Sequence, residues 1–466
     1  MATKKDLVEA YSFSRRRLVT AFVSGAPGGR EVEPARPGRM IVGGVALAIL
    51  LVAGAAIAGT LSQRAEVDWK KPGLVSDERG ALYVILDQDL VPGEPTIRPV
   101  INVTSAQLIL GADIKARKVP DKEIASQPKG PPIGILDAPA TVPLADQLVN
   151  SRWTACTGTG LGVRAAVRER PGVTTTPDQG FVVTGTTSKK TYLIAEAEVP
   201  GHPRRAYRYL LPDLDSGPLT TALNVQPGNE IEVPDAWLEL FPPGGALDAE
   251  GLGVTGLGED AGLPSFPGAA VGDVFTKSGA SYVITKAGPA ELTEFAAGVL
   301  AGTRQPAVVT PKDGVGYRVV PDSPYAGASW PTDLISGSPG ATQQVCAELV
   351  TAKGEQPAVV LATDPEGAVA ADDVVPGAQE ADVESGRGAL VRSADWNTSA
   401  DGTLHLIDDR GYSYQVAGRD ELGKLGYDKV PAVVVPDVWN KLFEDGPELS
   451  IDAALCPPSR TRTCGT

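Results

Sequence analysis

The feature that most constrains the fold of this chain is a fifteen-residue sequence that occurs twice. Residues 233–247 read VPDAWLELFPPGGAL and residues 435–449 read VPDVWNKLFEDGPEL, at an offset of 202. Eight of the fifteen positions are identical, including a Trp and a Phe, whose spacing chance rarely preserves. The match indicates an internal duplication, and a duplicated unit is typical of a scaffold.

Each copy predicts a short helix with one buried face. Pro234 and Pro436 suit the first helical turn, where a missing N–H costs nothing. The large side chains that follow are spaced three and four residues apart, so they share one face. The residues expected in two matching small cores are Trp237, Phe241, Trp439 and Phe443.

Four short β-like runs extend the repeat to residues 82–85, 192–194, 282–284 and 404–407. Aligned on Tyr83 and Tyr282, the first and third units are 199 residues apart, close to the 202 that separate the duplicated sequences. We therefore expect two halves related by an approximate two-fold axis. The stretches between the small units are rich in Val, Thr, Gly and Pro and predict strands of a shared central sheet.

The resulting expectation is an α+β chain with one N-terminal transmembrane helix, four small repeat units and a central β-rich domain. The expected segments are a cytosolic basic amphipathic segment at 1–40, the transmembrane helix at 41–61, a linker at 62–75, repeat units at 76–150, 185–250, 251–305 and 401–455, the central domain at 151–184 and 306–400, and a tail at 456–466.

The transmembrane helix is expected where 21 consecutive residues, 41–61, carry no charge. At about 1.5 Å per residue this run just spans a hydrocarbon core of about 30 Å. Six arginines precede it, so the positive-inside rule places the N-terminus in the cytoplasm and residues 62–466 outside, in a single-pass protein of the cytoplasmic membrane. The alternative is a cleaved secretion signal with a cleavage site near Ala56–Ala58.

Charge separates the two ends of the chain. Residues 1–40 carry eight Lys and Arg against four Asp and Glu, whereas residues 62–466 carry 34 against 53. An exported part this acidic repels phosphate backbones and excludes nucleic-acid binding as a function. The basic N-terminal segment predicts a short amphipathic helix ending near Gly25, which would lie on the inner leaflet, against a partner helix, or in solvent.

The four cysteines all lie in the exported part, and with only two histidines in the chain they do not favour a zinc site. An even number of exported cysteines indicates two disulfides, for which three pairings exist. Cys156 and Cys346 each lie between the two units of one half, so a two-fold axis would bring them together. Cys456 and Cys464 would then close a small C-terminal loop.

No catalytic, cofactor-binding or metal-binding residue is predicted. Residues 418–424, GRDELGK, match the start of a phosphate-binding loop, but Leu425 stands where the hydroxyl that holds Mg²⁺ is required. We expect a helix there that ends at Gly423. Neither His202 nor His405 has the serine motif of a hydrolase near it, and we expect no cofactor.

Further segments complete a pattern over the whole chain. They are Tyr11–Phe13 and Arg16–Leu18, the anchor at 41–61, Arg98–Ala106, Trp153 with Cys156, Asp322–Ser329, and the closing residues from Val435 to Ala454. Together they resemble the EccB family, a core membrane component of actinobacterial type VII (ESX) secretion systems.

The resemblance implies an elongated exported part with four repeats around a central domain, and a disulfide matching Cys156–Cys346. It implies a structural subunit for protein export, assembled with further EccB copies, the EccC ATPase, EccD and EccE. It also implies, as alternatives, an exported scaffold that binds peptidoglycan or a membrane-anchored ATPase. The resemblance leaves open whether the chain is an enzyme, and the lack of a complete nucleotide-binding motif in the sequence argues against ATPase activity.

Overall fold

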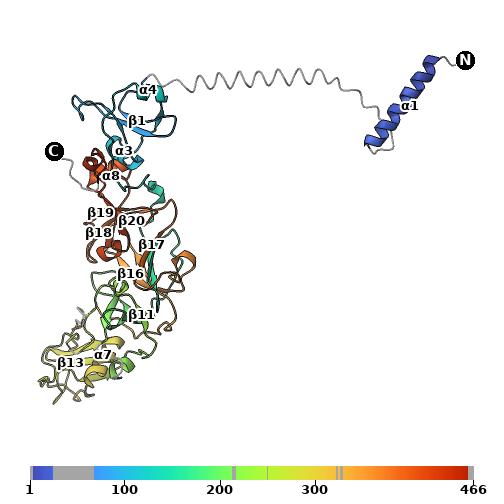
Figure 1. Cartoon of the computed structure of the whole chain (residues 1–466). Helices are drawn as coiled ribbons and strands as arrows, with labels where there is room; N and C mark the ends of the chain where they lie inside the picture. Colours follow the sequence, from blue (N-terminus) through green and yellow to red (C-terminus); the bar gives the residue numbers. More distant parts are fainter. Residues whose placement is uncertain are drawn as a thin grey trace. The chain divides into compact units, whose positions relative to one another are not determined.

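The computed structural model describes residues 4–24, 68–211, 217–248, 250–321, 324–325 and 329–459. The chain divides into two units, Met1–Val67 and Asp68–Thr466. The described part of the first unit is α1 (Lys4–Ser24), a helix of 21 residues (Figure 1). It ends next to Gly25, where the N-terminal helix was expected to end. The expected transmembrane segment lies outside the described residues, and none of the helices within them has the length and apolarity to cross a membrane.

The described residues of the second unit form five β-sheets. Four of these sheets follow one plan: three antiparallel strands, then a helix, then a segment that returns parallel to the first strand. In the third sheet the returning segment is a single bridge, between Val308 and Val274. The plan is the same for the two sheets that carry the duplicated sequence.

The elements of these four sheets, in chain order, are as follows. The first sheet has β1 (Gly73–Ser76), β2 (Leu82–Ile85), β3 (Ile97–Pro99), α3 (Val103–Leu110) and β4 (Arg117–Lys118). The second has β8 (Phe181–Gly185), β9 (Thr191–Ala197), β10 (Arg205–Leu210), α5 (Pro218–Ala222) and β11 (Ile231–Val233). The third has β12 (Val274–Lys277), β13 (Ala280–Thr285), β14 (Gly288–Leu292) and α7 (Glu294–Arg304). The fourth has β18 (Ala389–Ala394), β19 (Thr403–Ile407), β20 (Tyr412–Gln415), α8 (Arg419–Leu425), β21 (Val433–Pro436) and β22 (Glu444–Asp445).

The β-like runs recognised in the sequence are the second strands of these sheets. Each of these strands carries buried apolar side chains, which explains its apolar sequence. The first strands begin earlier, at Gly73, Phe181 and Ala389, than the unit boundaries expected at 76, 185 and 401. Each is needed as the partner of the returning segment, and the spacing of the duplicated sequence did not mark it.

The fifth sheet, here called the central sheet, takes strands from both expected central segments. Its order is β17-β6-β5-β15-β16-β7. The strands are β5 (Trp153–Thr157), β6 (Val163–Val167), β7 (Thr174–Thr175), β15 (Val345–Val350), β16 (Ala358–Thr363) and β17 (Gln379–Val383). Residues 306–344 were expected in this sheet but contribute none of its strands. The part around Val320 and Trp330 packs on the third sheet instead.

Shorter helices complete the described part of the second unit. They are α4 (Asp121–Ala125), η1 (Ala145–Gln147), α6 (Asp235–Leu238), η3 (Gly367–Val369), α9 (Asp437–Asn440) and α10 (Ile451–Ala454). The longer helices have side-chain caps: Asn102 accepts from the Ser105 N–H before α3, and Thr293 from the Ala296 N–H before α7. Helix α8 does not end at Gly423 as predicted. It continues to Leu425 and ends at Gly426, whose φ of 87° suits a left-handed cap.

Three hydrophobic cores connect the sheets. One is shared by the first and fourth sheets, where α3 packs against α8 (Figure 1). Another is shared by the second and third sheets, where α5 packs against α7. The core between them lies on the central sheet and takes side chains from the second and fourth sheets. The first and last parts of this unit therefore pack on each other.

The matched glycine of the duplicated sequence lies against a tyrosine ring in both copies. A Cβ atom on Gly244 would lie 2.1 Å from the ring of Tyr209, and one on Gly446 would lie 2.3 Å from the ring of Tyr414. Both rings are fully buried in the third strand of their sheet. Only glycine allows the chain to return this close to the strand.

We expect Gly446→Ala to destabilise the chain by about 1–3 kcal/mol, because the added methyl group overpacks a core that cannot move. The control is Gly423→Ala inside α8, where a Cβ would meet nothing within 4 Å and the alanine favours the helix. Thermal unfolding of the two purified variants measures the difference. An unfolding midpoint for Gly446→Ala equal to that of the control would contradict the packing described.

Candidate functional site

The residues that hold the halves of the second unit together are the candidate functional site. Cys156 in β5 and Cys346 in β15 face each other in the antiparallel register of these strands. A disulfide joins them and closes a separation of 190 residues. Both are fully buried, with Ala166, Ala362 and Val369 around them. The bridge therefore crosses the boundary between the strands of the two halves.

The strand order around the bridge is close to two-fold symmetric. Outward from the β5–β15 pair lie β6 and β16, the second central strand of each half. Beyond them the halves exchange strands, because β17 pairs with β6 and β7 pairs with β16. The exchanged strands differ in direction, since β17 is parallel to its partner and β7 is antiparallel. An antiparallel pair has a local two-fold axis, and the cysteines lie beside it.

The duplicated sequence supplies the other contacts with the central sheet. Pro234 and Pro436 each lie one residue before a short helix, α6 or α9, with φ near −60° in both copies. Both prolines therefore occupy the N-cap position, whereas the sequence had predicted that they lie in the first helical turn. Both tryptophans are fully buried, and Trp237 packs edge-on against Phe241 at a ring separation of 4.9 Å.

The two tryptophans lie in one shared core and not in the two matching small cores that were expected. The indole of Trp237 donates to the carbonyl of Ala155 in β5, at 2.8 Å. The indole of Trp439 donates to the carbonyl of Leu240 in the other copy, at 3.2 Å. Phe443 reaches the sheet itself, with its ring 5.4 Å from that of Trp153. Trp237 and Trp439 therefore share one buried cluster with Trp153 of the central sheet.

The matched aspartates hold each short helix to its own sheet. Asp235 accepts from the Thr187 N–H at 2.8 Å in the turn between β8 and β9. Asp437 accepts from the Ser393 hydroxyl at 2.6 Å at the end of β18. Burial acts to raise the pKa of Asp235, but hydrogen bonds from Ser188 and Thr187 outweigh it and leave the pKa below its usual value. The aspartates serve structure in both copies.

A buried arginine connects the second sheet to the fourth. Arg205 in β10 is only 3% exposed and has no carboxylate partner among the described salt bridges. Its guanidinium donates to the carbonyl of Trp396 at 2.7 Å, to Asn397 Oδ1 at 3.0 Å and to the hydroxyl of Tyr207 at 3.0 Å. It also lies over the rings of Tyr207 and Trp396. No sequence pattern marks this role, because Arg205 begins a strand that also contains the less buried Arg208.

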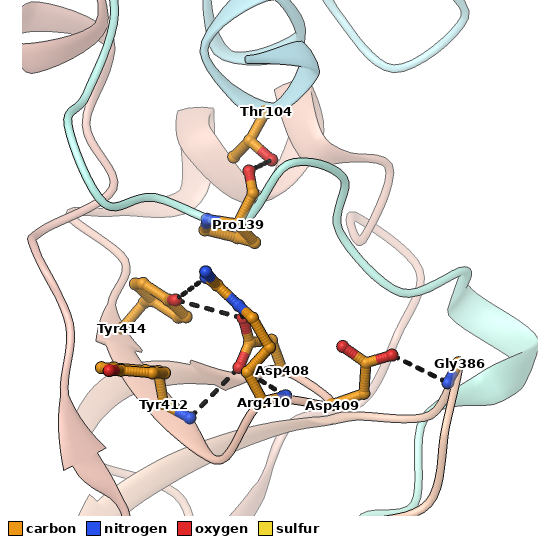
Figure 2. A network of polar contacts seen from close by, with 8 residues as sticks. All are labelled: Thr104, Pro139, Gly386, Asp408, Asp409, Arg410, Tyr412 and Tyr414. Atoms are coloured by element: carbon orange, nitrogen blue, oxygen red, sulfur yellow. Dashed lines mark hydrogen bonds and ion pairs between the residues drawn. The ribbon is translucent and has the colours of Figure 1, made fainter. Parts of the chain in front are cut away.

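Figure 2 shows a second polar joint, at the turn between β19 and β20. The buried carboxylate of Asp408 accepts from the N–H groups of Arg410 and Tyr412, both at 3.1 Å, and from Arg410 Nε at 2.8 Å. The hydroxyl of Tyr414 donates to it at 3.1 Å and also contacts Arg410. Burial, and then the charge of Asp408, raise the pKa of Tyr414 far above its usual value.

Neighbouring bonds tie this turn to the rest of the unit. Asp409 accepts from the Gly386 N–H at 3.0 Å, which holds the turn to the segment before β18 (Figure 2). Arg387 in that segment donates to Glu169, next to β6, at 2.6 Å. The network therefore fixes the fourth sheet on the central sheet.

A cleft of about 550 Å³ lies between the second sheet and residues 331–336. Its lining is mostly acidic among the charged residues and includes Glu196, which contacts Arg204 at 3.0 Å. Burial raises the pKa of Glu196, although bonds from the Leu361 N–H and Arg204 oppose the shift. No group of three or more His, Cys, Asp or Glu with metal-binding geometry occurs within the described ranges.

Residues 418–424, which match the start of a phosphate-binding loop, form the N-cap and most of helix α8 and hold it to α3. Lys424 lies in the last turn of α8, and not at the start of a helix as in a phosphate-binding loop. Its ammonium group donates to the carbonyl of Ile109 at 3.2 Å, at the C-terminal end of α3. The lysine therefore joins the first sheet to the fourth.

The two histidines lie in different settings. His202 contacts Gln356 Oε1 through Nδ1 at 2.8 Å, in the turn before β10. His405 contacts Ser413 Oγ at 3.0 Å, and burial lowers its pKa while the charges of Asp445 and Asp437 act against the shift. Cys456 is disulfide-bonded, and its expected partner Cys464 lies outside the described residues.

Comparison with known proteins decides the family. The family model described as "Type VII secretion system ESX-1, transport TM domain B" matches residues 1–458. The chain belongs to this EccB family.

Named relatives resemble this EccB-family chain over nearly its full length. The "ESX-2 secretion system ATPase EccB2" of Mycobacterium tuberculosis is 29% identical over 449 residues, which cover 85% of each chain. The "ESX-1 secretion system ATPase EccB1" of the same species is 24% identical over 481 residues, covering 97% of this chain and 94% of the relative.

Solved structures share the fold. One is a chain of an intact ESX-5 inner membrane complex, with a TM-score of 0.61 at 21% identity over 100% of this chain and 97% of that one. Another is the EccB3 dimer from the ESX-3 core complex, with a TM-score of 0.61 at 20% identity over 82% of this chain and 100% of that one. At these identities the likeness concerns the fold.

Replacing both Cys156 and Cys346 by alanine should destabilise the second unit by about 3–5 kcal/mol, because the bridge closes a very long loop of the unfolded chain. Thermal unfolding of the purified double variant, compared with the oxidised wild type, measures this loss. A matched control is wild type unfolded under strong reductant, which should approach the variant. An unchanged midpoint in the double variant would show that strand pairing alone holds the halves.

Replacing Lys424 by methionine should cost about 1 kcal/mol of stability, because the hydrogen bond to the Ile109 carbonyl is lost while the apolar stem is kept. Any ATP turnover by the purified chain should stay at the wild-type level. The exposed Lys429→Met is the matched control and should change neither quantity. Loss of turnover in Lys424→Met at unchanged stability would support a nucleotide site instead.

Proposed function

We propose that this EccB-family chain is a structural subunit of a type VII secretion membrane complex, supporting protein export across the cytoplasmic membrane. The observation that carries the proposal is the family match, which runs through residues 1–458 and so includes both units. The contacts of the described residues support a frame. The disulfide, the shared tryptophan core and the two polar joints all serve to fix one part of the second unit on another.

The proposed topology follows from the sequence. Residues 41–61 form a single membrane anchor, the N-terminal segment with α1 is cytosolic, and the second unit is exported. An oxidising compartment agrees with the disulfide at the centre of that unit.

The proposed organisation of the exported part is four repeat units around the central sheet. Its support is the common plan of the four sheets, the matched tyrosine and glycine in two of them, and the strand order around Cys156 and Cys346. We draw the units from the first strand of each sheet, at residues 73, 181, 274 and 389, and the central domain from β5–β7 and β15–β17.

The proposed partners are further EccB copies, the EccC ATPase, EccD and EccE. A solved structure of a similar chain is titled as an EccB3 dimer, and two others as parts of an ESX-5 inner membrane complex. Export of proteins across a membrane needs energy, and an ATPase in the same membrane would supply it.

The test is affinity purification of the tagged full chain from native membranes in mild detergent. Co-purification of an FtsK-like ATPase in one high-mass complex, identified by mass spectrometry and cross-linking, is the expected result. An unrelated tagged single-pass protein of the same membrane is the control. A lone monomer in mild detergent would contradict the proposal. A lone monomer whose exported part sediments with isolated cell walls would favour a peptidoglycan-binding scaffold.

A further inference from the structure

Helix α1 carries an apolar stripe that nothing in the described structure covers. Leu7, Tyr11, Leu18 and Phe22 are spaced by four, seven and four residues, which places them on one face of a helix. Their exposed fractions are 66, 74, 72 and 93%. Val8 and Val19 widen the stripe and are also exposed. An uncovered apolar face of this size on one helix marks an interaction surface.

Basic residues flank this stripe. The helix contains Lys4, Lys5 and the run Arg15–Arg17 against Asp6 and Glu9, so it is positively charged overall. Arg15 lines a shallow groove on the stripe together with Tyr11, Leu18 and Phe22. An arginine at such a place can lay its methylene stem along apolar surface and hold its guanidinium at the polar level above it.

This combination fits an anionic lipid surface. An amphipathic helix at a bilayer buries its apolar face at the acyl boundary while Lys and Arg side chains contact phosphates. A groove on another protein would need the stripe but not the basic residues beside it. The charge therefore favours lipid as the occupant.

The distance to the anchor allows this placement. Residues 25–40, sixteen in number, separate α1 from the proposed anchor at 41–61. A chain of that length spans at most about 55 Å when extended, so α1 stays close to the surface of the bilayer that holds the anchor. Tethering raises the effective concentration of a weakly binding helix at that surface.

We propose that α1 lies in the cytosolic interface of the membrane, with the Leu7–Phe22 stripe in the acyl boundary and the basic residues on anionic lipid headgroups. The inference rests on the proposed function only in taking residues 41–61 as the anchor. The orientation of α1 is then fixed along the membrane plane before any partner binds.

The test uses the full chain in nanodiscs, where both membrane faces are accessible. Single variants Leu18→Cys, on the stripe, and Glu9→Cys, on the opposite face, are labelled with a water-soluble maleimide. The nanodiscs contain either phosphatidylcholine alone or phosphatidylcholine with phosphatidylglycerol. The wild-type chain, treated in parallel, gives the background from its own cysteines.

The expected result is that phosphatidylglycerol slows labelling of Leu18→Cys by about tenfold. Since only helices that are not bound to lipid react, this factor corresponds to about ten lipid-bound helices for each free one. Labelling of Glu9→Cys should not change. Replacing Arg15, Arg16 and Arg17 by glutamine in the Leu18→Cys chain should restore fast labelling. Equal rates at positions 18 and 9 in both lipids would overturn the proposal. Protection that appears only in the native complex would also overturn it, because a protein would then cover the stripe.

Failure of the anchor is a separate result. If the chain does not co-elute with nanodiscs at all, residues 41–61 are not an anchor and the proposed topology fails. In that case the same water-soluble chain is mixed with vesicles of phosphatidylcholine and phosphatidylglycerol. If it does not bind them, the proposal that α1 contacts lipid fails as well. If the chain co-elutes but position 18 stays accessible, only the α1 proposal fails.

Discussion

The antiparallel pairing of β5 with β15 is the constraint on which the rest of the second unit depends. It brings together strands nearly two hundred residues apart and sets their register so that Cys156 faces Cys346. A slip by one residue would turn every side chain to the opposite face of the sheet. The cysteines would then separate, and Ala155 would no longer present its carbonyl to Trp237 in the same way. The disulfide therefore fixes a register that the tryptophan core also requires.

The symmetric pairing has a consequence for folding. The first sheet shares its core with the fourth, although they lie at opposite ends of this unit's sequence. The second sheet instead shares its core with the third, its neighbour in sequence. Contacts between segments far apart in the sequence form slowly, because the entropy cost of closing the loop is incurred before the apolar contacts that offset it can form. Each half also gives a strand to the other's edge of the central sheet. A half made alone would expose apolar surface, so we infer that the two halves complete each other's folding.

The sequence predicted the parts that leave a periodic or duplicated trace. Trp237 and Trp439, the central sheet and the pairing of Cys156 with Cys346 could all be reached from spacing or resemblance. The first strand of each sheet could not, because four to six ordinary residues before a turn carry little signal of their own. The merging of two expected cores into one also escaped prediction, since a helical stripe shows that a face is buried but not against what. The polar joints at Arg205 and Asp408 were missed because a charge in the sequence reads as solvated until the fold buries it.

These joints also explain how a duplicated sequence yields a frame with unlike ends. Trp237 donates to the central sheet, whereas its counterpart Trp439 donates to the backbone of the other matched sequence. The turn of the fourth sheet is held by Asp408 with Arg410, while the second sheet places Arg205 among neutral acceptors and aromatic rings. A buried cation without a carboxylate is stable only where its donors are satisfied, so Arg205 requires the Trp396 carbonyl in one position. The matched sequences thus place similar apolar side chains in the core, and the unmatched polar contacts determine how its two sides differ. Two sides that differ in this way can receive different neighbours in an assembly.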